Sequence, residues 1–308
     1  MENQATVSLV LGSGGARGLA HIGAIDALTG AGYRIESIAG SSMGALVGGM
    51  YAAGKLDVYS EWVQQLEQSD VLRLVDWTFS GGGLIRGDRI INRLREMVGD
   101  AEIEKLDIDF TAVAVDIEAG REIWLSRGSL FEAIRGSIAI PGLFTPHRYR
   151  GRLLVDGGIL NPVPVAPTLR CLSDLTIVVN VNADIARPHA IVAASGRKRT
   201  GDDGNLAEGD DEDSIVERLR RFFNGLVERG EEQEKSAPGL VAMMMKTLET
   251  MEAVITRQHL AVFQPDLVIE IPKNACMVHE FHRAAELIEL GRARTIRALE
   301  RLRGETHE

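Results

Sequence analysis

The sequence of 308 residues contains only two cysteines, Cys171 and Cys276, which lie far apart. Without a C-x-x-C spacing they exclude a disulfide framework and a zinc ribbon, and they suit a reducing compartment. No apolar run approaches the roughly 18 residues of a transmembrane helix. The N-terminal sequence, MENQATVSLVLGSGG, lacks the basic start and long apolar run of a secretory signal. We therefore expect a cytoplasmic protein.

Basic residues are fewer than acidic ones, 34 against 44, which gives a net charge of −10. Seven of the 44 acidic residues lie between Asp202 and Asp213, a stretch without Lys or Arg. Without these seven the net charge would be 34 − 37 = −3, so the excess of acidic residues is mostly local. A chain with this balance lacks the basic surface that binds phosphate backbones, and we expect no nucleic-acid partner. The stretch Ser195–Asp213 has almost no apolar content, which predicts a disordered acidic insertion.

The rest of the composition is that of a globular protein, with 45% hydrophobic and 25% charged residues. A chain of this length buries a complete core without disulfides or a structural metal. No group of residues has the spacing of a metal site, so we expect neither a metal nor another cofactor. Because α/β folds of this size often form one domain, we expect a single domain over residues 1–308.

The first 54 residues predict alternating strands and helices. Val7–Leu11 is a short apolar run before a glycine cluster, as in a buried strand, and residues 19–28 carry apolar side chains at helical spacing. A second apolar run, Ile35–Ala39, precedes the turn Gly40–Gly44 and a helix of small residues. The order strand, helix, strand, helix is the beginning of a parallel α/β sheet.

The remaining sequence predicts a hairpin, further strands and two more helices. The hairpin is 110–117 with 122–126, the strands are 153–155, 175–181 and 267–271, and the helices are 88–98 and 281–302. Asp88 is the expected N-cap of the first of these helices. Asn161–Pro167 contains three prolines and is expected to be extended, because proline lacks the N–H group that a helix uses. Residues 239–303 are expected to form C-terminal helices and a closing strand.

A serine lies in the turn after the second predicted strand, in the pattern Gly40-x-Ser42-x-Gly44. A sharp turn from strand to helix holds the hydroxyl out of the sheet, and glycines beside it avoid clashes with neighbouring backbone. The helix that follows points its free N–H groups and the positive end of its dipole at the serine oxygen. This context favours a nucleophilic serine over an inert turn residue.

A glycine-rich loop, Gly12–Gly18, follows the first predicted strand. It departs from the dinucleotide-binding fingerprint, whose third glycine position holds Arg17, and it lacks the Gly-Lys-Ser/Thr of a P-loop. The remaining interpretation is an oxyanion hole for a tetrahedral acyl intermediate formed on Ser42. If the two strands are neighbours, their carboxyl ends place the loop and the serine around one carbonyl group. Each oxyanion donor is typically worth about 3 kcal/mol of barrier.

A serine hydroxyl needs a base, and the sequence offers a strand-end aspartate and seven histidines. Asp156 ends the predicted strand 153–155 and is followed by Gly157 and Gly158. This setting suits a buried catalytic group, but it is also typical of an ordinary turn. None of the histidines lies in a glycine-rich or strand-end context. The residues alone leave both interpretations of Asp156 open.

Four segments resemble the patatin-like phospholipase family in order and spacing. They are LVLGSGGARGLAHIGAIDAL, GSSMG, SIAIPGLFTP (Ser137–Pro146) and LLVDGG. The resemblance extends over residues 6–182 and points above all to bacterial members and to the catalytic domain of neuropathy target esterase. It implies a three-layer α/β/α hydrolase with a mostly parallel central sheet. It also implies a phospholipid, lysophospholipid or simpler ester as substrate, and no metal.

The resemblance further implies a Ser–Asp dyad without histidine, with Ser42 as nucleophile and Asp156 as base. It places Gly14, Gly15, Ala16, Arg17 and Gly18 in the oxyanion loop, adds the N–H of Met43, and includes Gly40, Gly44, Gly157 and Gly158 as motif glycines. A free aspartate, with a pKa of about 3.9, is a weak base for a hydroxyl group. Burial must therefore raise the pKa of Asp156.

Several alternatives stay open. An α/β-hydrolase triad would add His259, His279 or His282, although that fold places several strands before its elbow. An acyltransferase would pass the same acyl group to an alcohol or thiol, and a non-catalytic module would use the fold to bind a partner. A methionine-rich stripe from Leu240 to Ile255 predicts core or homodimer packing, or else contact with an acyl chain or with the inner membrane face.

Overall fold

The computed structural model describes residues 4–74, 76, 85–184 and 240–305 of the chain. The chain forms two compact units, one of Met1–Ala186 with Glu249–Glu308 and the other of Arg187–Leu248. The predicted insertion Ser195–Asp213 lies outside the described residues, and the single domain over 1–308 stays a prediction. Every site residue discussed below belongs to the first unit.

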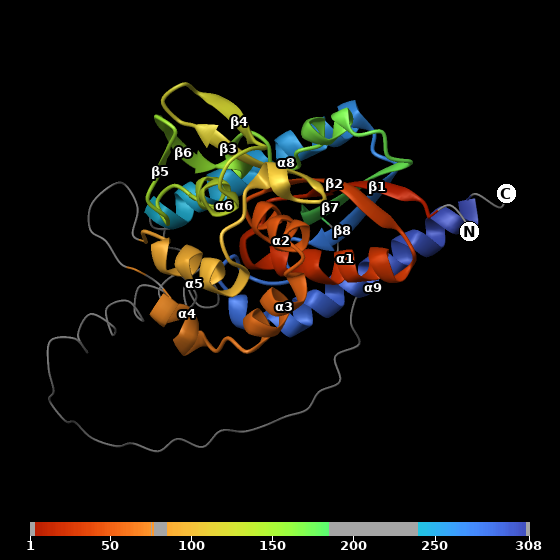
Figure 1. Ribbon diagram of the computed structural model, residues 1–308, viewed down its shortest axis with the longest axis horizontal. Helices are drawn as coiled ribbons and strands as arrows, with labels where there is room; N and C mark the ends of the chain where they lie inside the picture. Colours follow the sequence, from red (N-terminus) through yellow and green to blue (C-terminus); the bar gives the residue numbers. More distant parts are fainter. Residues whose placement is uncertain (1–3, 75, 77–84, 185–239, 306–308) are drawn as a thin grey trace, which may run out of the picture. The chain divides into compact units, whose positions relative to one another are not determined.

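A central sheet of eight strands organises the first unit (Figure 1). Five strands are parallel: β1 (Thr6–Leu11), β2 (Arg34–Ser41), β3 (Asp109–Asp116), β7 (Leu175–Ala183) and β8 (Leu267–Pro272). Three shorter strands pair in antiparallel fashion: β4 (Arg121–Leu125), β5 (His147–Tyr149) and β6 (Arg152–Asp156). The order is β5-β6-β3-β2-β1-β7-β8, and β4 pairs with β3. β1 and β2 are thus neighbours, as the predicted oxyanion hole requires.

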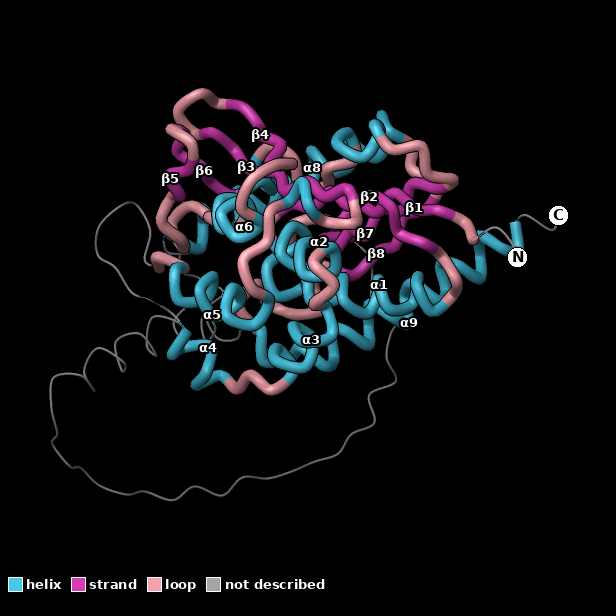
Figure 2. The backbone as a smooth tube through the Cα atoms, viewed as in Figure 1, coloured by secondary structure: helices cyan, strands magenta, loops and turns pink. Residues whose placement is uncertain are grey.

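Helices connect the strands and follow the last of them (Figure 2). The α-helices of the described residues are α1 (Ala20–Gly30), α2 (Met43–Ala52), α3 (Leu56–Gln64), α4 (Gln68–Leu74), α5 (Asp88–Val98), α6 (Leu130–Ser137), α8 (Leu240–Phe263) and α9 (Ala284–Glu305). Short 3-10 helices are η1 (Gly15–Leu19), η2 (Ile103–Lys105), η3 (Gly157–Ile159), η4 (Ala166–Arg170) and η6 (Phe281–Arg283). Within these described residues, no helix has the length and apolarity needed to cross a membrane.

The sheet is covered on both faces because its central strands are apolar on both sides. Side chains alternate across a strand, so Leu9 of β1 joins the main core with α1, α2 and α9, and Val10 faces the opposite way. Val10 packs with Val163, and Leu260 and Phe263 of α8 contact this second cluster. The predicted three-layer α/β/α fold with a mostly parallel sheet is confirmed.

Helices α1 and α9 lie side by side on one face of the sheet (Figure 1). Glycines at their contact let the two backbones touch. A Cβ atom on Gly23 would lie 1.8 Å from the carbonyl oxygen of Ile288, and one on Gly291 would lie 1.9 Å from that of Ala20. Neither distance is possible for real atoms, so any side chain at these positions would push the helices apart.

We expect Gly23→Ala to lower the free energy of unfolding by about 3 kcal/mol, because overpacking forces α9 away from the core. Gly30→Ala is the matched control in the same helix, since an added Cβ there has no atom within 4 Å. The control should leave stability unchanged or raise it by up to about 1 kcal/mol, because alanine favours helix. Urea denaturation measures both variants, and equal effects would contradict the close helix contact.

The predicted extended segment Asn161–Pro167 is wrong at its end. Ala166–Arg170 forms the 3-10 helix η4, with Pro167 in its first turn. Proline is tolerated there because the first N–H groups of a helix have no acceptor within the helix, so a missing N–H costs nothing. The segment therefore begins as a loop and ends in a short helix. The side chains of Val163 and Val165 in the loop belong to the second core cluster.

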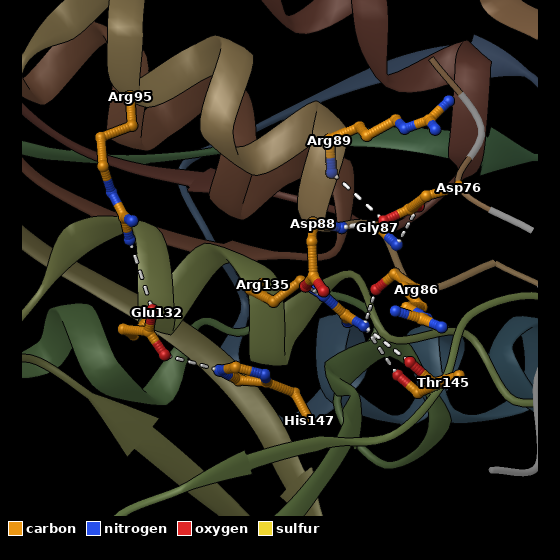
Figure 3. A network of polar contacts seen from close by, with 10 residues as sticks. All are labelled: Asp76, Arg86, Gly87, Asp88, Arg89, Arg95, Glu132, Arg135, Thr145 and His147. Atoms are coloured by element: carbon orange, nitrogen blue, oxygen red, sulfur yellow. Dashed lines mark hydrogen bonds and ion pairs between the residues drawn. The ribbon is translucent and has the colours of Figure 1, made fainter. Parts of the chain in front are cut away.

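The predicted N-cap of α5 is also wrong. Asp88 is the first residue of the helix, and the cap position is Gly87, with a φ of 78°. The capping carboxylate comes from Asp76, which accepts the N–H groups of Gly87, Asp88 and Arg89 at 2.6, 2.9 and 3.3 Å (Figure 3). An acceptor so far back in the chain satisfies the free N–H groups as well as a local cap does.

Candidate active site

Ser42 lies between the end of β2 and the start of α2 and is 3% exposed. Its backbone has a φ of 55° and a ψ of −122°, a conformation that non-glycine residues rarely adopt and that is found at functional sites. Two glycines make the turn possible. A Cβ atom on Gly40 would lie 2.4 Å from Ala45 N, and one on Gly44 would lie 2.0 Å from Leu11 O. The GSSMG turn therefore has the geometry of a nucleophile elbow.

The pairing of β3 explains why the ends of β2 and β6 meet. Residues 112–113 of β3 pair with both β2 and β4, so β2 and β4 lie on opposite edges of β3. Residues 114–116 pair with both β4 and β6, so β6 lies on the same edge as β2. Ser41 ends β2 and Asp156 ends β6, and they pair with consecutive residues of β3. The two strands end head to head, which brings Ser42 beside Asp156.

The side chains of Ser42 and Asp156 are in direct contact. Ser42 Oγ donates a hydrogen bond to Asp156 Oδ2 over 2.6 Å, and Asp156 Oδ1 accepts the N–H of Gly158 over 2.8 Å. Burial raises the pKa of Asp156 to about 6, although these two hydrogen bonds oppose the rise. The carboxylate is therefore ionised at neutral pH and is a stronger base than an exposed aspartate.

No histidine stands between the two side chains, because their hydrogen bond is direct. The buried His21 has its Nε2 2.8 Å from Gly12 O, and burial lowers its pKa to about 4, so the ring is neutral. Of the histidines considered for a triad, His259 has its Nδ1 3.4 Å from Val163 O. Both rings are thus paired with backbone carbonyl oxygens.

Ser137, at the end of α6, forms a hydrogen bond with the backbone of the elbow, and the sequence gives no signal for this role. Its hydroxyl donates to Val113 O over 2.6 Å and accepts the N–H of Ser42 over 2.9 Å. Two residues further on, Ala139 O accepts the N–H of Asp156 over 2.9 Å. The end of α6 therefore holds the backbone of both Ser42 and Asp156. A lone serine after a helix carries no sequence signal for such a role.

The loop between β1 and α1 packs directly on the elbow, since a Cβ atom on Gly18 would lie 2.4 Å from the Cβ of Met43. The N–H of Ala16 donates to a carbonyl oxygen outside the loop over 2.9 Å and is not free for a substrate. Among the described residues, the N–H groups of Gly14 and Gly15 have no acceptor. Met43 begins α2, where the first N–H groups lack intrahelical partners. Within the described part of the chain, the N–H groups of Gly14, Gly15 and Met43 are therefore available to the predicted oxyanion hole, whereas that of Ala16 is not.

Arg17 holds this loop in shape from inside the protein. Its Nε donates to Gly14 O over 3.3 Å and its Nη1 donates to Lys273 O over 2.7 Å. In a trans peptide the C=O and the next N–H point in opposite directions. Because the guanidinium binds Gly14 O, the N–H of Gly15 points away from it. Glu249 of α8 lies 3.7 Å from Arg17 Nη2 and balances its charge.

A second carboxyl group, that of Glu252 in α8, lies beside Asp156, and the sequence gives no signal for it. A Cβ atom on Gly158 would lie 2.6 Å from Glu252 Oε1 and 2.9 Å from Ser13 Oγ. Glu252 Oε2 accepts a long hydrogen bond of 3.4 Å from Asn182 Nδ2. Burial, with the nearby Asp156 carboxylate, raises the pKa of Glu252 to about 8, and Arg17 and the Ser13 hydroxyl oppose this rise.

Arg135 of α6 joins the chain at Arg86 to the chain at Thr145 (Figure 3). Its buried guanidinium donates to the carbonyl oxygen of Arg86, and to the carbonyl and hydroxyl oxygens of Thr145 at 3.0 and 3.1 Å. The Cζ atom also lies 5.9 Å from the ring centroid of Phe144. These contacts fix the chain that follows Ser137. They therefore stabilise the support on which the elbow rests.

The fold is α/β, and Ser42 lies in a strand-to-helix turn with the geometry of a nucleophile elbow. A family model described as patatin-like phospholipase matches residues 9–169. An uncharacterized NTE family protein of Mycobacterium tuberculosis is 41% identical over 96% of this chain and 91% of its own length. The chain belongs to the patatin-like phospholipase family, so the predicted family is confirmed. Membership supports lipid-hydrolase activity and a lipid substrate.

More distant relatives carry enzyme names. Lysophospholipase nte1 of Emericella nidulans is 30% identical over 58% of this chain, and neuropathy target esterase sws of Drosophila persimilis is 33% identical over 52%. The matches cover 12% of each of these longer proteins. Among solved structures, VipD of Legionella pneumophila aligns with a TM-score of 0.44 and 14% identity over 97% of this chain and 67% of its own.

Asp156→Asn should stabilise the protein at neutral pH. The pKa of Asp156, about 6 when folded, exceeds the unfolded value, so stability falls as pH rises between about 4 and 6. Above that window the buried, ionised Asp156 lowers the free energy of unfolding by about 3 kcal/mol, because each tenfold change in proton affinity is worth about 1.4 kcal/mol. We expect the variant to exceed the parent by about 2–3 kcal/mol at pH 7.5 and to match it near pH 4, as measured by urea denaturation. A difference independent of pH would assign the effect to packing.

Ser137→Ala should weaken both the fold and the elbow. It leaves the buried N–H of Ser42 and the carbonyl of Val113 without their partner, so we expect a loss of about 2 kcal/mol in the free energy of unfolding. Turnover should fall by about tenfold, because the serine backbone is less firmly held. Ser60→Ala, which removes a hydroxyl near the surface of α3, is the control and should change stability by less than about 0.5 kcal/mol. Equal losses in both variants would contradict the support role.

Proposed function

We propose that the protein is a serine lipid acyl hydrolase, which cleaves carboxylic ester bonds of phospholipids, lysophospholipids or related esters through a dyad of Ser42 and Asp156. The observation that carries the proposal is the direct hydrogen bond of 2.6 Å from the elbow serine to a buried carboxylate. A hydroxyl group held against a base of raised pKa, beside backbone N–H donors, has what nucleophilic attack on an ester requires.

Acylation begins when Ser42 Oγ attacks the ester carbonyl carbon and its proton moves to Asp156 Oδ2. The negative charge that leaves the carboxylate reappears on the substrate oxygen, so the net charge of the site does not change. The N–H groups of Gly14, Gly15 and Met43 then stabilise that oxygen, at about 3 kcal/mol for each donor. Asp156 returns the proton to the leaving alcohol as the C–O bond breaks, and the acyl group stays on Ser42.

Deacylation repeats these steps with water. Asp156 takes a proton from the attacking water, the same donors hold the new tetrahedral oxygen, and Ser42 leaves with the proton as the fatty acid is released. The buried carboxylate suits both halves of the reaction because its pKa of about 6 lies close to neutral pH, where a group can both take and give a proton. An acyltransferase would differ only in the acceptor, and that alternative stays a prediction.

The setting of the reaction also stays a prediction. We propose a cytoplasmic protein whose helix α8 contacts the inner membrane face peripherally. The alternative is that the same side of α8 packs in a homodimer. On α8, the side chains of Met251, Val254 and Val262 are 46%, 41% and 73% exposed. Exposed apolar residues on one helix are consistent with either kind of contact.

The test is turnover of a panel of phosphatidyl, lysophosphatidyl and short-chain nitrophenyl esters. We expect hydrolysis by the parent protein and a loss of about 10³-fold or more in Ser42→Ala and in Asp156→Asn, because members of a catalytic unit fail together. A fluorophosphonate should label Ser42 in the parent.

Asp116→Asn is the matched control for the aspartate variant. Asp116 is also a buried aspartate at a strand end, yet its carboxyl group accepts the N–H of Ala119, away from Ser42. This variant should keep its rate within about threefold of the parent. Near-normal turnover by Asp156→Asn would reject the dyad, and a parent protein that neither hydrolyses esters nor labels would favour a non-catalytic binding module.

A further inference from the structure

Glu252 brings a second, partly buried carboxyl group to the proposed active site. It lies on α8, more than ninety positions along the chain from Asp156, and only the fold brings the two groups together. Its Oε1 occupies the space over Gly158, and the N–H of that glycine is one of the two donors to Asp156. Ser13 Oγ lies in the same space, buried and without a well-formed hydrogen bond among the described residues. Glu252 therefore sits between the end of β6 and the oxyanion loop.

The charged groups around Glu252 come from three elements. Asp156 faces it from the end of β6, Arg17 from the oxyanion loop, and Glu249 from the preceding turn of its own helix. Arg17 is already shared with Gly14 O, Lys273 O and Glu249. The net charge of these four groups would be −2 if every carboxyl were ionised, and Asp156 among them is only 4% exposed. Two neighbouring carboxyl groups, of which one is buried and the other partly buried, rarely ionise together, so one of them keeps a proton.

Hydrogen bonding decides which carboxyl group keeps the proton. Asp156 receives two good donors, Ser42 Oγ at 2.6 Å and Gly158 N at 2.8 Å, and donors favour the ionised form. Glu252 receives one long bond of 3.4 Å from Asn182, and the Ser13 hydroxyl also favours its ionised form. The ionised carboxylate is therefore Asp156, and the proton stays on Glu252 at neutral pH. The order of the two pKa values, about 6 and about 8, agrees with this assignment.

We propose that Glu252 is a positioning residue of the active site that must stay protonated for the reaction to run, and that its ionisation sets the alkaline limit of activity. The proposal rests on the proposed function. In the attack step, one negative charge moves from Asp156 to the substrate oxygen in the oxyanion loop. A neutral Glu252 allows this movement, whereas an ionised Glu252 adds a second negative charge next to the loop. That charge also draws Arg17 away from Gly14 O, and so loosens the loop.

The test compares pH profiles of the parent, Glu252→Gln and Glu249→Gln. The parent rate should rise as Asp156 ionises near pH 6 and fall with a midpoint near pH 8. Glutamine has the shape of a protonated glutamate but cannot ionise. At pH 9, Glu252→Gln should therefore keep a fraction of its own maximal rate that is about tenfold larger than that of the parent. Glu249→Gln, which removes a carboxylate one turn away, should still show the alkaline fall.

The rate of fluorophosphonate labelling of Ser42 gives a second readout, with Ser42→Ala as the blank. It should show the same alkaline fall in the parent and the same loss of that fall in Glu252→Gln. Because labelling needs no lipid substrate, it tests Glu252 even if no ester in the panel is hydrolysed, which would count against the proposed function alone. Thermal unfolding at each pH shows that the variants are folded.

Two results would overturn the proposal. If the labelling rate of Glu252→Gln falls at alkaline pH as that of the parent does, a group other than Glu252 causes the fall. If Glu252→Gln loses labelling by more than about 100-fold at every pH, the carboxyl group itself transfers a proton and is not a positioning residue. In that case a glutamine of the same shape fails because it can neither give nor take a proton.

Discussion

The hydrogen bond between Ser42 Oγ and Asp156 Oδ2 is the interaction on which the rest of the site depends. Burial favours a protonated carboxyl group, and hydrogen bonds from Ser42 and Gly158 favour an ionised one. A carboxylate with more donors would be too weak a base, and one with fewer would keep its proton at neutral pH. The balance leaves Asp156 ionised but with a raised pKa, which is what its proposed role as a base without a histidine partner needs.

The sheet and its loops hold this bond in place. β2 and β6 end head to head on one edge of β3. Ser42 and Asp156 therefore meet directly at the strand ends, without a long loop between strand and side chain. Ser137 and Ala139 then fix the two backbones, and Arg17 shapes the donor loop. The surrounding layers pack through small residues, with glycines where backbones touch. The strained φ of Ser42 is maintained because so many contacts determine the turn.

The sequence predicts the parts of the site that depend on local pattern. Glycines between an apolar run and a helical run mark both the elbow and the donor loop. Asp156 is ambiguous in the sequence, because an aspartate before two glycines is also a common turn, and only the family resemblance implies its role as a base. Ser137 and Glu252 could not be found, since their roles arise from contacts with residues about a hundred or more positions away. The cap that Asp76 provides for α5 was missed for the same reason, over a shorter separation.

The most direct test of the central claim is the ionisation of Asp156 itself in the resting protein. Carbon-13 NMR of aspartate-labelled protein, with Asp156→Asn to assign the signal, follows that carboxyl group through a pH titration. We predict a midpoint near pH 6 and a higher midpoint in Ser42→Ala, because that variant loses a donor to the carboxylate. A midpoint near pH 4 that Ser42→Ala leaves unchanged would contradict the role of Asp156 as a buried base.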